Sequence, residues 1–185
     1  MNATTLRVPE DVRLEAWIAT YTGRRFHPFR PRVGDIDIRD IAHGLAMTWW
    51  ACRFRGQCRA HYTIAQHSVE VARVIRARGG SAYAALAGLL HDASEAYLPD
   101  IAAPIKAWLP DYRALEQTIQ TAIEVYFLGD SPDDDTRKLV READRIMLAT
   151  EAYALMPPPV DWESIRGVVP LRNWRGPLRR PEDAE

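Results

Sequence analysis

The sequence predicts an all-α protein that folds as a single-domain compact helical bundle. Apolar residues recur at helical spacing along most of the chain, and strand-like alternation is nowhere sustained. The length of 185 residues suits one hydrophobic core, and 47% hydrophobic with 26% charged residues is ordinary for a globular protein. We therefore expect amphipathic helices around one core, with no disulfide or metal needed merely to fold.

Two helices are predicted in the N-terminal part of the chain, at 9–19 and 38–50, because apolar residues there are three or four positions apart. The segment 23–34 between them is interrupted by glycine and proline, and we expect it to form a long ordered loop. The second helix should bury one apolar stripe. Its members are Ile38, Ile41, Ala42, Leu45 and Trp49.

The third helix has clear signals at both ends. Thr63 and Gln66 form a Thr-x-x-Gln capping box, in which each side chain can satisfy an unpaired amide of the first turn. Gly79 and Gly80 end the helix. His67 lies on its apolar face, so this imidazole should point inward.

Three further helices are predicted. The fourth, at 82–97, is apolar almost all round in its first half, which is typical of a helix buried among others. The fifth should run over 110–128 and end at a glycine. The last, at 131–153, should begin with Ser131 as its N-cap and Pro132 as its first helical residue.

Charge and cysteine content exclude several protein classes. A net charge of −1 argues against binding to polymeric nucleic acid. Two cysteines do not form the disulfide framework of a secreted domain, and charged residues in 1–20 do not resemble a signal sequence, so we expect a cytoplasmic protein. The longest apolar run, 82–90, is too short to span a membrane.

Arginine is concentrated in the segment 24–59, where eight arginines accompany three aspartates and give a local charge of +5. One interpretation is a solvated basic surface. The other is a docking surface for a small phosphorylated ligand, because guanidinium groups bind phosphate oxygens in a bidentate manner. The sequence alone leaves both open.

Four metal-type ligands should converge in the interior. These are His67, His91, Asp92 and Asp144. Asp92 follows a long apolar run, and a carboxylate buried there is costly unless it is paired, hydrogen-bonded or bound to metal. Imidazole and carboxylate without thiolate suit a divalent cation with positions open for water and substrate, which is typical of a catalytic site.

Each of these assignments has an ordinary alternative. His67 could be a hydrogen-bonded core histidine, and Asp144 could pair with a neighbouring surface arginine. Glu95 follows His91 by four residues, so the two should share a helix face. Glu151 lies seven residues after Asp144 and could orient a metal-binding histidine, although a surface salt bridge is the commoner role.

The order of His67, His91-Asp92 and Asp144 resembles the H…HD…D pattern of the HD-domain superfamily of metal-dependent phosphohydrolases. The resemblance covers roughly residues 37–155. The stretch from His91 to Glu95, followed by Asp100 and Pro104-Ile105-Lys106, is similar to the bacterial 5′-deoxynucleotidases of that superfamily and to phage HD-domain dATP triphosphohydrolases.

The resemblance implies roles for the matched residues. His67, His91, Asp92 and Asp144 would hold a divalent cation, which could be Co²⁺, Mn²⁺, Ni²⁺, Fe²⁺, Zn²⁺ or Mg²⁺. Glu95 would position or deprotonate the attacking water, or protonate the leaving oxygen. The substrate contacts would come from Arg53, Phe54, Asp100, Pro104 and Lys106.

Within that substrate set, Arg53 would contact phosphate and Asp100 would accept a hydrogen bond from the 3′-hydroxyl. Pro104 and Lys106 match positions near the base and the phosphate. Phe54 stands where the family has a tryptophan beside the sugar, which leaves the strength of deoxyribose selection open.

On this basis the chain divides into three parts: an N-terminal helix and ordered flap segment (1–36), an HD-type helical phosphohydrolase core (37–156) and a proline-rich tail, packed on the surface or partly disordered (157–185). We expect the flap to contribute Arg24, Arg25 or His27 to the pocket.

The expected activity is removal of the 5′-phosphate from a deoxynucleotide. The alternative within the superfamily is a dNTP triphosphohydrolase that prefers dATP. Two non-enzyme alternatives are a nucleotide sensor and a structural zinc module built from Cys52, Cys58, His61 and His67. The expected partner is a small nucleotide, with no polymeric nucleic acid and no membrane, and the six tryptophans favour a homo-oligomer.

Overall fold

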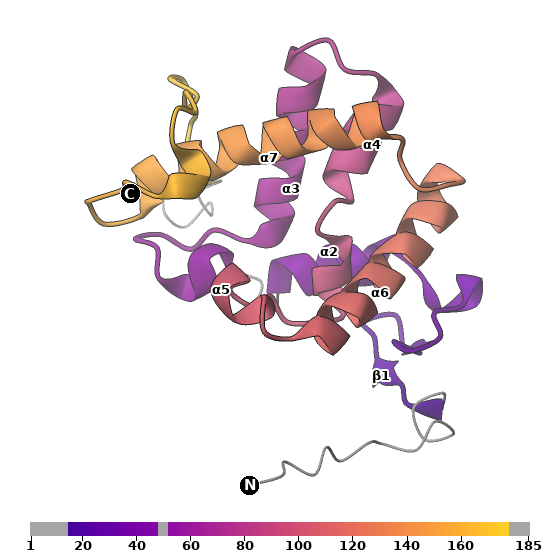
Figure 1. The fold of residues 1–185 in the computed structure, drawn as a ribbon. Coiled ribbons are helices and arrows are strands. Elements are labelled where there is room, and N and C mark those ends of the chain that lie inside the picture. The colour runs from indigo at the N-terminus through magenta and orange to yellow at the C-terminus, as the bar shows by residue number, and fades with distance from the viewer. Residues whose placement is uncertain (1–14, 48–51, 178–185) are drawn as a thin grey trace, which may run out of the picture.

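The computed structural model describes residues 15–47 and 52–177, and within them the chain forms one all-α domain, as predicted (Figure 1). The helices are α2 (Ile38–Met47), α3 (Ile64–Ala77), α4 (Ala82–Leu89), α5 (Ala103–Lys106), α6 (Pro110–Leu128) and α7 (Asp134–Leu155). The short 3-10 helices are η1 (Val33–Asp35), η3 (Arg53–Gly56), η4 (Ala93–Ala96) and η5 (Glu163–Ile165). Two-residue strands, β1 (Ile18–Ala19) and β2 (Arg25–Phe26), pair antiparallel.

The helices pack in two groups with separate hydrophobic clusters, and α3 contributes to both clusters. α3, α4 and α7 contact one another, with α7 crossing the other two in the upper half of the view, while α2 and α6 lie below them (Figure 1). η4 lies between α2 and α6 and contacts both. The chain between α4 and η4 therefore runs from one group of helices to the other.

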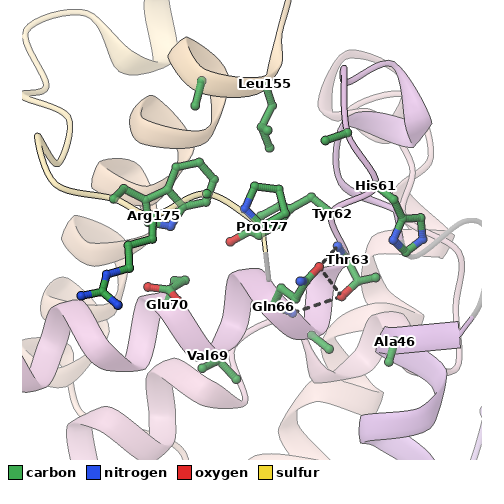
Figure 2. Close-up of a pocket in the computed structure, with 15 residues that line it drawn as sticks. Ala46, His61, Tyr62, Thr63, Gln66, Val69, Glu70, Leu155, Arg175 and Pro177 are labelled. Carbon is green, nitrogen blue, oxygen red and sulfur yellow. Dashed lines mark hydrogen bonds between the residues drawn. The ribbon is translucent and has the colours of Figure 1, made fainter. Parts of the chain in front are cut away.

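The capping box at the start of α3 is confirmed. The Thr63 hydroxyl accepts a hydrogen bond from the Gln66 amide at 3.2 Å, and Gln66 Oε1 accepts one from the Thr63 amide at 2.9 Å (Figure 2). The buried face of the helix carries His67, Ser68 and Val71. The predicted inward direction of His67 is therefore correct.

The fourth predicted helix is much shorter than expected. α4 ends at Leu89, and the residues after it form a turn followed by η4, so His91 and Glu95 do not share a helix face. In a continued α-helix the Asp92 amide would bond to the carbonyl of Gly88. The Nδ1 of His91 lies 2.8 Å from that carbonyl oxygen and takes its place as donor.

Other predicted boundaries need smaller corrections. Ile18–Ala19 is a strand and not the end of a helix, and the rest of the first predicted helix falls largely outside the described residues. α7 begins at Asp134 because the N-cap is Asp133, whose side chain accepts from the Thr136 amide at 2.8 Å, and not Ser131. The fifth predicted helix is confirmed as α6.

α2 begins as predicted, and its expected end at 50 lies outside the described residues. Its buried face contains Ile41, Gly44 and Leu45, whereas Ile38 is 45% exposed and Ala42 is also exposed, so two members of the predicted stripe are wrong. The face is rotated because η4 packs directly against Gly44.

Beyond α7, residues 157–177 follow the surface of that helix and include η5, where Ile165 is buried against Ala149 and Ala152. Trp174 packs against the cluster that contains Val71 and Met147. Within the described part of the chain, no helix has the length and apolar character to cross a membrane.

Candidate metal centre

Three elements bring metal-type ligands to one point. His67 comes from the buried face of α3, His91 from the turn just after α4, and Asp144 from the middle of α7. One ligand atom from each of the three lies within 4.8 Å of the others. The cluster lies where the two groups of helices meet.

The two imidazoles face each other, with 3.4 Å between their Nε2 atoms. Asp144 Oδ1 lies 3.1 Å from Nε2 of His67 and 3.8 Å from Nε2 of His91. Asp92 Oδ2 lies 3.3 Å from Nε2 of His91 and 3.9 Å from Nε2 of His67. The structure thus brings together all four of the ligands named from the sequence, with Asp92 at the margin of the tightest group.

The hydrogen bonds on the far side of each ring fit a metal site. Nδ1 of His67 lies 2.7 Å from Glu151 Oε1, and Nδ1 of His91 lies 2.8 Å from the Gly88 carbonyl oxygen. A carbonyl oxygen only accepts, as does an ionised carboxylate, so both Nδ1 atoms carry a proton. In the neutral rings the lone pairs on Nε2 then point into the cluster, as metal ligation requires.

The cluster also favours positive charge. Burial opposes protonation of His91, but the carboxylates of Asp92 and Asp144 outweigh this and raise its pKa to about 9. Burial would raise the pKa of Asp144, yet His67 and His91 hold it well below its ordinary value. Without a metal ion, a proton on His91 compensates the negative charge of these carboxylates, as a bound metal cation would. These residues could hold a metal ion.

Glu151 is not on the surface, which corrects the commoner role expected from the sequence. Its side chain is fully buried, and its two oxygens contact different partners. Oε1 bonds to His67, while Oε2 lies 3.1 Å from Nη2 and 3.2 Å from Nε of Arg53. Burial acts to raise the pKa of Glu151, and the charges of His67 and Arg53 lower it overall.

Arg53 lies at the edge of the ligand cluster. Its Nη1 is 4.0 Å from Asp92 Oδ2, and its side chain is only 16% exposed. The next two residues, Phe54 and Arg55, have left-handed backbone conformations with φ of 55° and 52°. Such conformations are costly for residues other than glycine and concentrate at functional sites. The turn directs Arg53 toward the centre and Arg55 toward Asp100, at 3.6 Å.

A cleft of about 600 Å³ opens beside the ligands. Its lining includes His91, Asp92 and Glu95 together with the cationic side chains of Lys106 and Arg113. Burial, with the nearby carboxylates of Asp92 and Asp100, raises the pKa of Glu95 from 4.5 to about 9. A carboxyl group in this state holds its proton near neutral pH.

Of the predicted substrate residues, Lys106 lines this cleft, whereas Arg53, Phe54, Asp100 and Pro104 are not among its lining residues. Lys106 Nζ is 2.7 Å from Glu116 Oε1 and 3.8 Å from Asp100 Oδ1, so Asp100 lies between Lys106 and Arg55. Pro104 is exposed on α5. Phe54 packs edge to face on Trp162 at 5.6 Å, within the cluster formed by the C-terminal segment and α7.

Sequence reasoning missed Gln120 of α6, which holds the turn that carries the ligands. Its Nε2 donates to the Leu90 carbonyl at 2.9 Å, and its Oε1 accepts from the Ser94 amide at 3.2 Å. Leu90, just before His91, and Ser94, just after Asp92 and Ala93, are thereby both held by α6. The helical spacing of α6 gave no signal for this, because the partner groups are backbone atoms of a turn.

The N-terminal segment is anchored to the core by Phe26, which stacks on Tyr97, and its predicted pocket residues contact other residues of the same segment. Arg24 donates to the Gly34 carbonyl at 2.9 Å, and His27 lies 2.8 Å from Asp35 Oδ2. Arg25 stacks over Trp17 at 4.6 Å. None of these three predicted pocket residues is among those that line the cleft.

A larger pocket, of about 840 Å³, lies between the start of α3 and the C-terminal segment (Figure 2). Tyr62, Gln66 and Pro177 are among the residues that line it, but none of the four predicted ligands is. Size alone would favour this pocket as the functional site. We place the site at the smaller cleft because the converging ligand atoms lie there.

The zinc-module alternative does not fit the geometry. His67 faces His91 and Asp144, and Cys58 Sγ is 3.0 Å from the Ala60 carbonyl oxygen. Within residues 15–47 and 52–177, the metal-type group of three or more side chains consists of His67, His91 and Asp144 and includes neither Cys52 nor Cys58.

Fold and site together define an all-α protein with a candidate centre of two histidines and carboxylates. No model of a known protein family matches the sequence. The chain is 38% identical over 136 residues to the uncharacterized protein YfdR of Escherichia coli (strain K12), which covers 74% of this chain and 70% of YfdR. It is 34% identical over 143 residues to the uncharacterized protein RCAP_rcc00048 of Rhodobacter capsulatus, which covers 74% of this chain and 71% of that protein. The chain belongs to the same family as these two proteins.

Proposed function

We propose that the protein is a metal-dependent phosphohydrolase of the HD-domain type that removes the 5′-phosphate from deoxynucleotides. The observation that carries the proposal is the convergence of His67, His91 and Asp144 beside a cleft with cationic side chains. Two imidazole nitrogens and a carboxylate are a ligand set for divalent cations that leaves positions open. A small anionic substrate suits a cleft whose lining includes the cations Lys106 and Arg113 beside carboxylates that could hold a metal ion.

In this proposal His67, His91, Asp92 and Asp144 hold the cation, which is Mn²⁺, Co²⁺, Ni²⁺, Fe²⁺, Zn²⁺ or Mg²⁺. When bound, such a cation polarises a phosphate oxygen and activates water for attack. The two tautomers fixed by Glu151 and Gly88 keep the Nε2 atoms available for it.

Arg53 and Lys106 bind the phosphate oxygens. Arg53 is fixed by Glu151 on one side, which leaves Nη1 facing the cluster. Lys106 is held by Glu116 at 2.7 Å, and both residues line the cleft. Groups held in place before the reaction stabilise developing charge most effectively, and positioning with charge compensation is most of what a protein supplies to phosphoryl transfer.

Glu95 is the proton donor to the leaving 5′-oxygen. Its raised pKa of about 9 keeps the carboxyl group protonated near neutral pH. Asp100, held between Arg55 and Lys106, accepts a hydrogen bond from the sugar 3′-hydroxyl.

A dNTP triphosphohydrolase activity is the second candidate. The observation that favours it is the presence of Arg113 on α6 as a further cation along the cleft, in addition to Lys106. A monophosphate needs fewer cations than a triphosphate chain does. The two activities differ in their products, since only the second releases tripolyphosphate in one step.

The test is a panel of deoxynucleotides and ribonucleotides, mono- through triphosphate, with Mn²⁺, Co²⁺ and Mg²⁺ and with products separated by chromatography. We expect deoxynucleoside and phosphate from deoxynucleoside monophosphates, and tripolyphosphate from dATP if the second candidate holds. Protein that binds metal but hydrolyses no nucleotide in the panel would contradict both and would favour the sensor.

Glu95→Gln separates catalysis from binding. We expect this variant to lose most of its turnover, by about 100-fold or more, while Mn²⁺ affinity stays near that of the wild type because Glu95 is not a ligand. Glu142→Gln, which removes an exposed carboxylate from α7, is the control and should keep full turnover. Near-native turnover in Glu95→Gln with normal metal binding would refute the assigned role.

A further inference from the structure

We propose that Glu151 is a positioning residue that fixes His67 as a metal ligand and Arg53 as a phosphate-binding group through one buried carboxylate. The role of Glu151 toward Arg53 rests on the proposed function. Its role toward His67 rests on the metal centre alone. Glu151 does not serve as a ligand in it, because each of its oxygens already has a protein partner.

The bond to His67 sets which ring nitrogen faces the cation. Glu151 Oε1 and His67 Nδ1 are 2.7 Å apart, and both side chains are fully buried. The carboxylate can only accept, so Nδ1 carries the proton and Nε2 is the donor atom toward Asp144, at 3.1 Å. The same bond prevents the ring from rotating out of the cluster. Such a partner behind a ligating histidine also raises its basicity.

The second oxygen holds Arg53. Two nitrogens of the guanidinium group, Nε and Nη2, lie 3.2 and 3.1 Å from Oε2 of Glu151. The third, Nη1, is left facing Asp92 at 4.0 Å. Glu151 therefore compensates the buried charge of Arg53 and directs its free edge toward the ligand cluster. Removing this carboxylate would affect both the metal ligand and the phosphate-binding group.

Glutamine is the informative replacement at this position. It has nearly the same shape, but it offers one acceptor and one donor where Glu151 offers two acceptors. Whichever way the amide turns, its NH₂ group faces an N–H donor of either His67 or Arg53. Glu151→Gln should therefore weaken Mn²⁺ binding by about 10- to 100-fold, as expected for loss of a carboxylate behind a metal-binding histidine.

The experiment measures Mn²⁺ affinity without nucleotide, by competition with a metal-binding dye, for wild type, Glu151→Gln and Glu142→Gln. Glu142→Gln removes the same charge from an exposed face of the same helix and should bind Mn²⁺ as the wild type does. Thermal unfolding of each metal-free protein shows whether it is folded. Glu151→Gln with wild-type affinity would overturn the proposal.

A second measurement includes an observation on the wild type alone, which does not depend on how well the variant folds. In the Co²⁺-loaded wild type, an imidazole that binds through Nε2 shows its Nδ1 proton as a paramagnetically shifted NMR signal that disappears in D₂O. We expect two such signals in the wild type, one from His67 and one from His91, with the His67 signal displaced in Glu151→Gln and both unchanged in Glu142→Gln. Fewer than two signals in the wild type, with the missing one assigned to His67, would overturn the proposal, because His67 would then not present Nε2 to the metal.

The outcomes distinguish this inference from the proposed function. If the wild type binds Mn²⁺ and Glu151→Gln binds it weakly, the role of Glu151 toward His67 stands even when no nucleotide is hydrolysed. If nucleotide is hydrolysed and Glu151→Gln keeps wild-type metal affinity, the proposed function stands and the role of Glu151 is wrong.

Discussion

Each histidine of the candidate centre uses one ring nitrogen for the protein and leaves the other for the cluster. The inward direction of His67 followed from its place on the apolar face of a helix with a strong capping box, and this was predictable from sequence. The partner of Nδ1 was not predictable for His91. It is the carbonyl of Gly88, an oxygen that becomes free only because α4 ends there.

Glu95 should make the stability of the metal-free protein depend on pH. Its pKa rises from 4.5 to about 9 on folding, because burial and neighbouring carboxylates disfavour the charged form. A group with a raised pKa in the folded state stabilises the fold fully below its unfolded pKa and loses that contribution as pH rises toward the folded value. The contribution of Glu95 to stability should therefore be lost between about pH 4.5 and pH 9.

Glu95→Gln removes this loss, because the amide does not ionise. We expect its free energy of unfolding, measured with denaturant at a series of pH values, to fall less over this range, and to exceed that of the wild type near pH 8 by about 1 kcal/mol or more. Parallel curves for the two proteins would show that Glu95 does not titrate in this way.

At the scale of elements, the helices whose ends depend on local sequence signals were predicted well. The capping box of α3 and the whole of α6 are confirmed, since hydrogen bonds within a few residues decide their ends. α4 was predicted too long because its apolar composition continues to Leu90. The helix ends where the His91 side chain bonds to the Gly88 carbonyl and where α2 and α6 pack against η4. Tertiary contacts of this kind leave little trace in spacing.

Gly44 allows α2 to approach η4, and a larger residue should disturb this contact. A Cβ at this position would lie 2.9 Å from both the Cβ and the backbone oxygen of Ala96. Backbone cannot move aside as a flexible side chain can. Gly44→Ala should therefore destabilise the fold by about 1–3 kcal/mol despite the better helix propensity of alanine, measured as a lower denaturant midpoint.

Gly34→Ala is the matched control for that substitution. A Cβ at Gly34 meets no atom within 4 Å, and its φ is not in the left-handed region. We expect the midpoint to stay the same or rise slightly, since alanine restricts the unfolded chain. Equal destabilisation by the two substitutions would mean that the contact with Ala96 is not the cause.

At the scale of the whole molecule, the basic segment 24–59 is not one surface. Arg24 and Arg39 pair with Asp37, Arg53 pairs with Glu151, and Arg55 pairs with Asp100. None of the described residues of this segment is among those that line the cleft, and Arg53 lies at the edge of the ligand cluster. The local charge of +5 therefore overstates the use of the segment in binding phosphate. The sequence identified the residue types, but their division between structural and site roles depends on partners distant along the chain.

The homo-oligomer expected from the six tryptophans stays a prediction.

Metal binding should stabilise the molecule, because the ligands come from three elements that meet only in the folded state. At a free Mn²⁺ concentration of 100 times Kd, the expected gain is about 2.7 kcal/mol, or about 5–10 °C in Tm for a chain of this size. Thermal unfolding with and without a chelator measures it.

Asp144→Asn should lose most of this stabilisation, because it removes a charged ligand from the centre. The comparison matters because exposed carboxylates elsewhere can bind Mn²⁺ weakly. If Mn²⁺ raises the Tm of Asp144→Asn as much as that of the wild type, the ion binds at another place.

The bonds of Glu151 span long stretches of chain, since His67 lies 84 positions before it and Arg53 lies 98 positions before it. Contacts of this separation form late, after the cost of closing a large loop has been met. During synthesis α3 and α4 leave the ribosome well before α7, so the histidines are made before the carboxylates that complete their site. Tight binding of a metal ion should then coincide with the docking of α7, so the onset of metal binding would report when the last step of folding occurs.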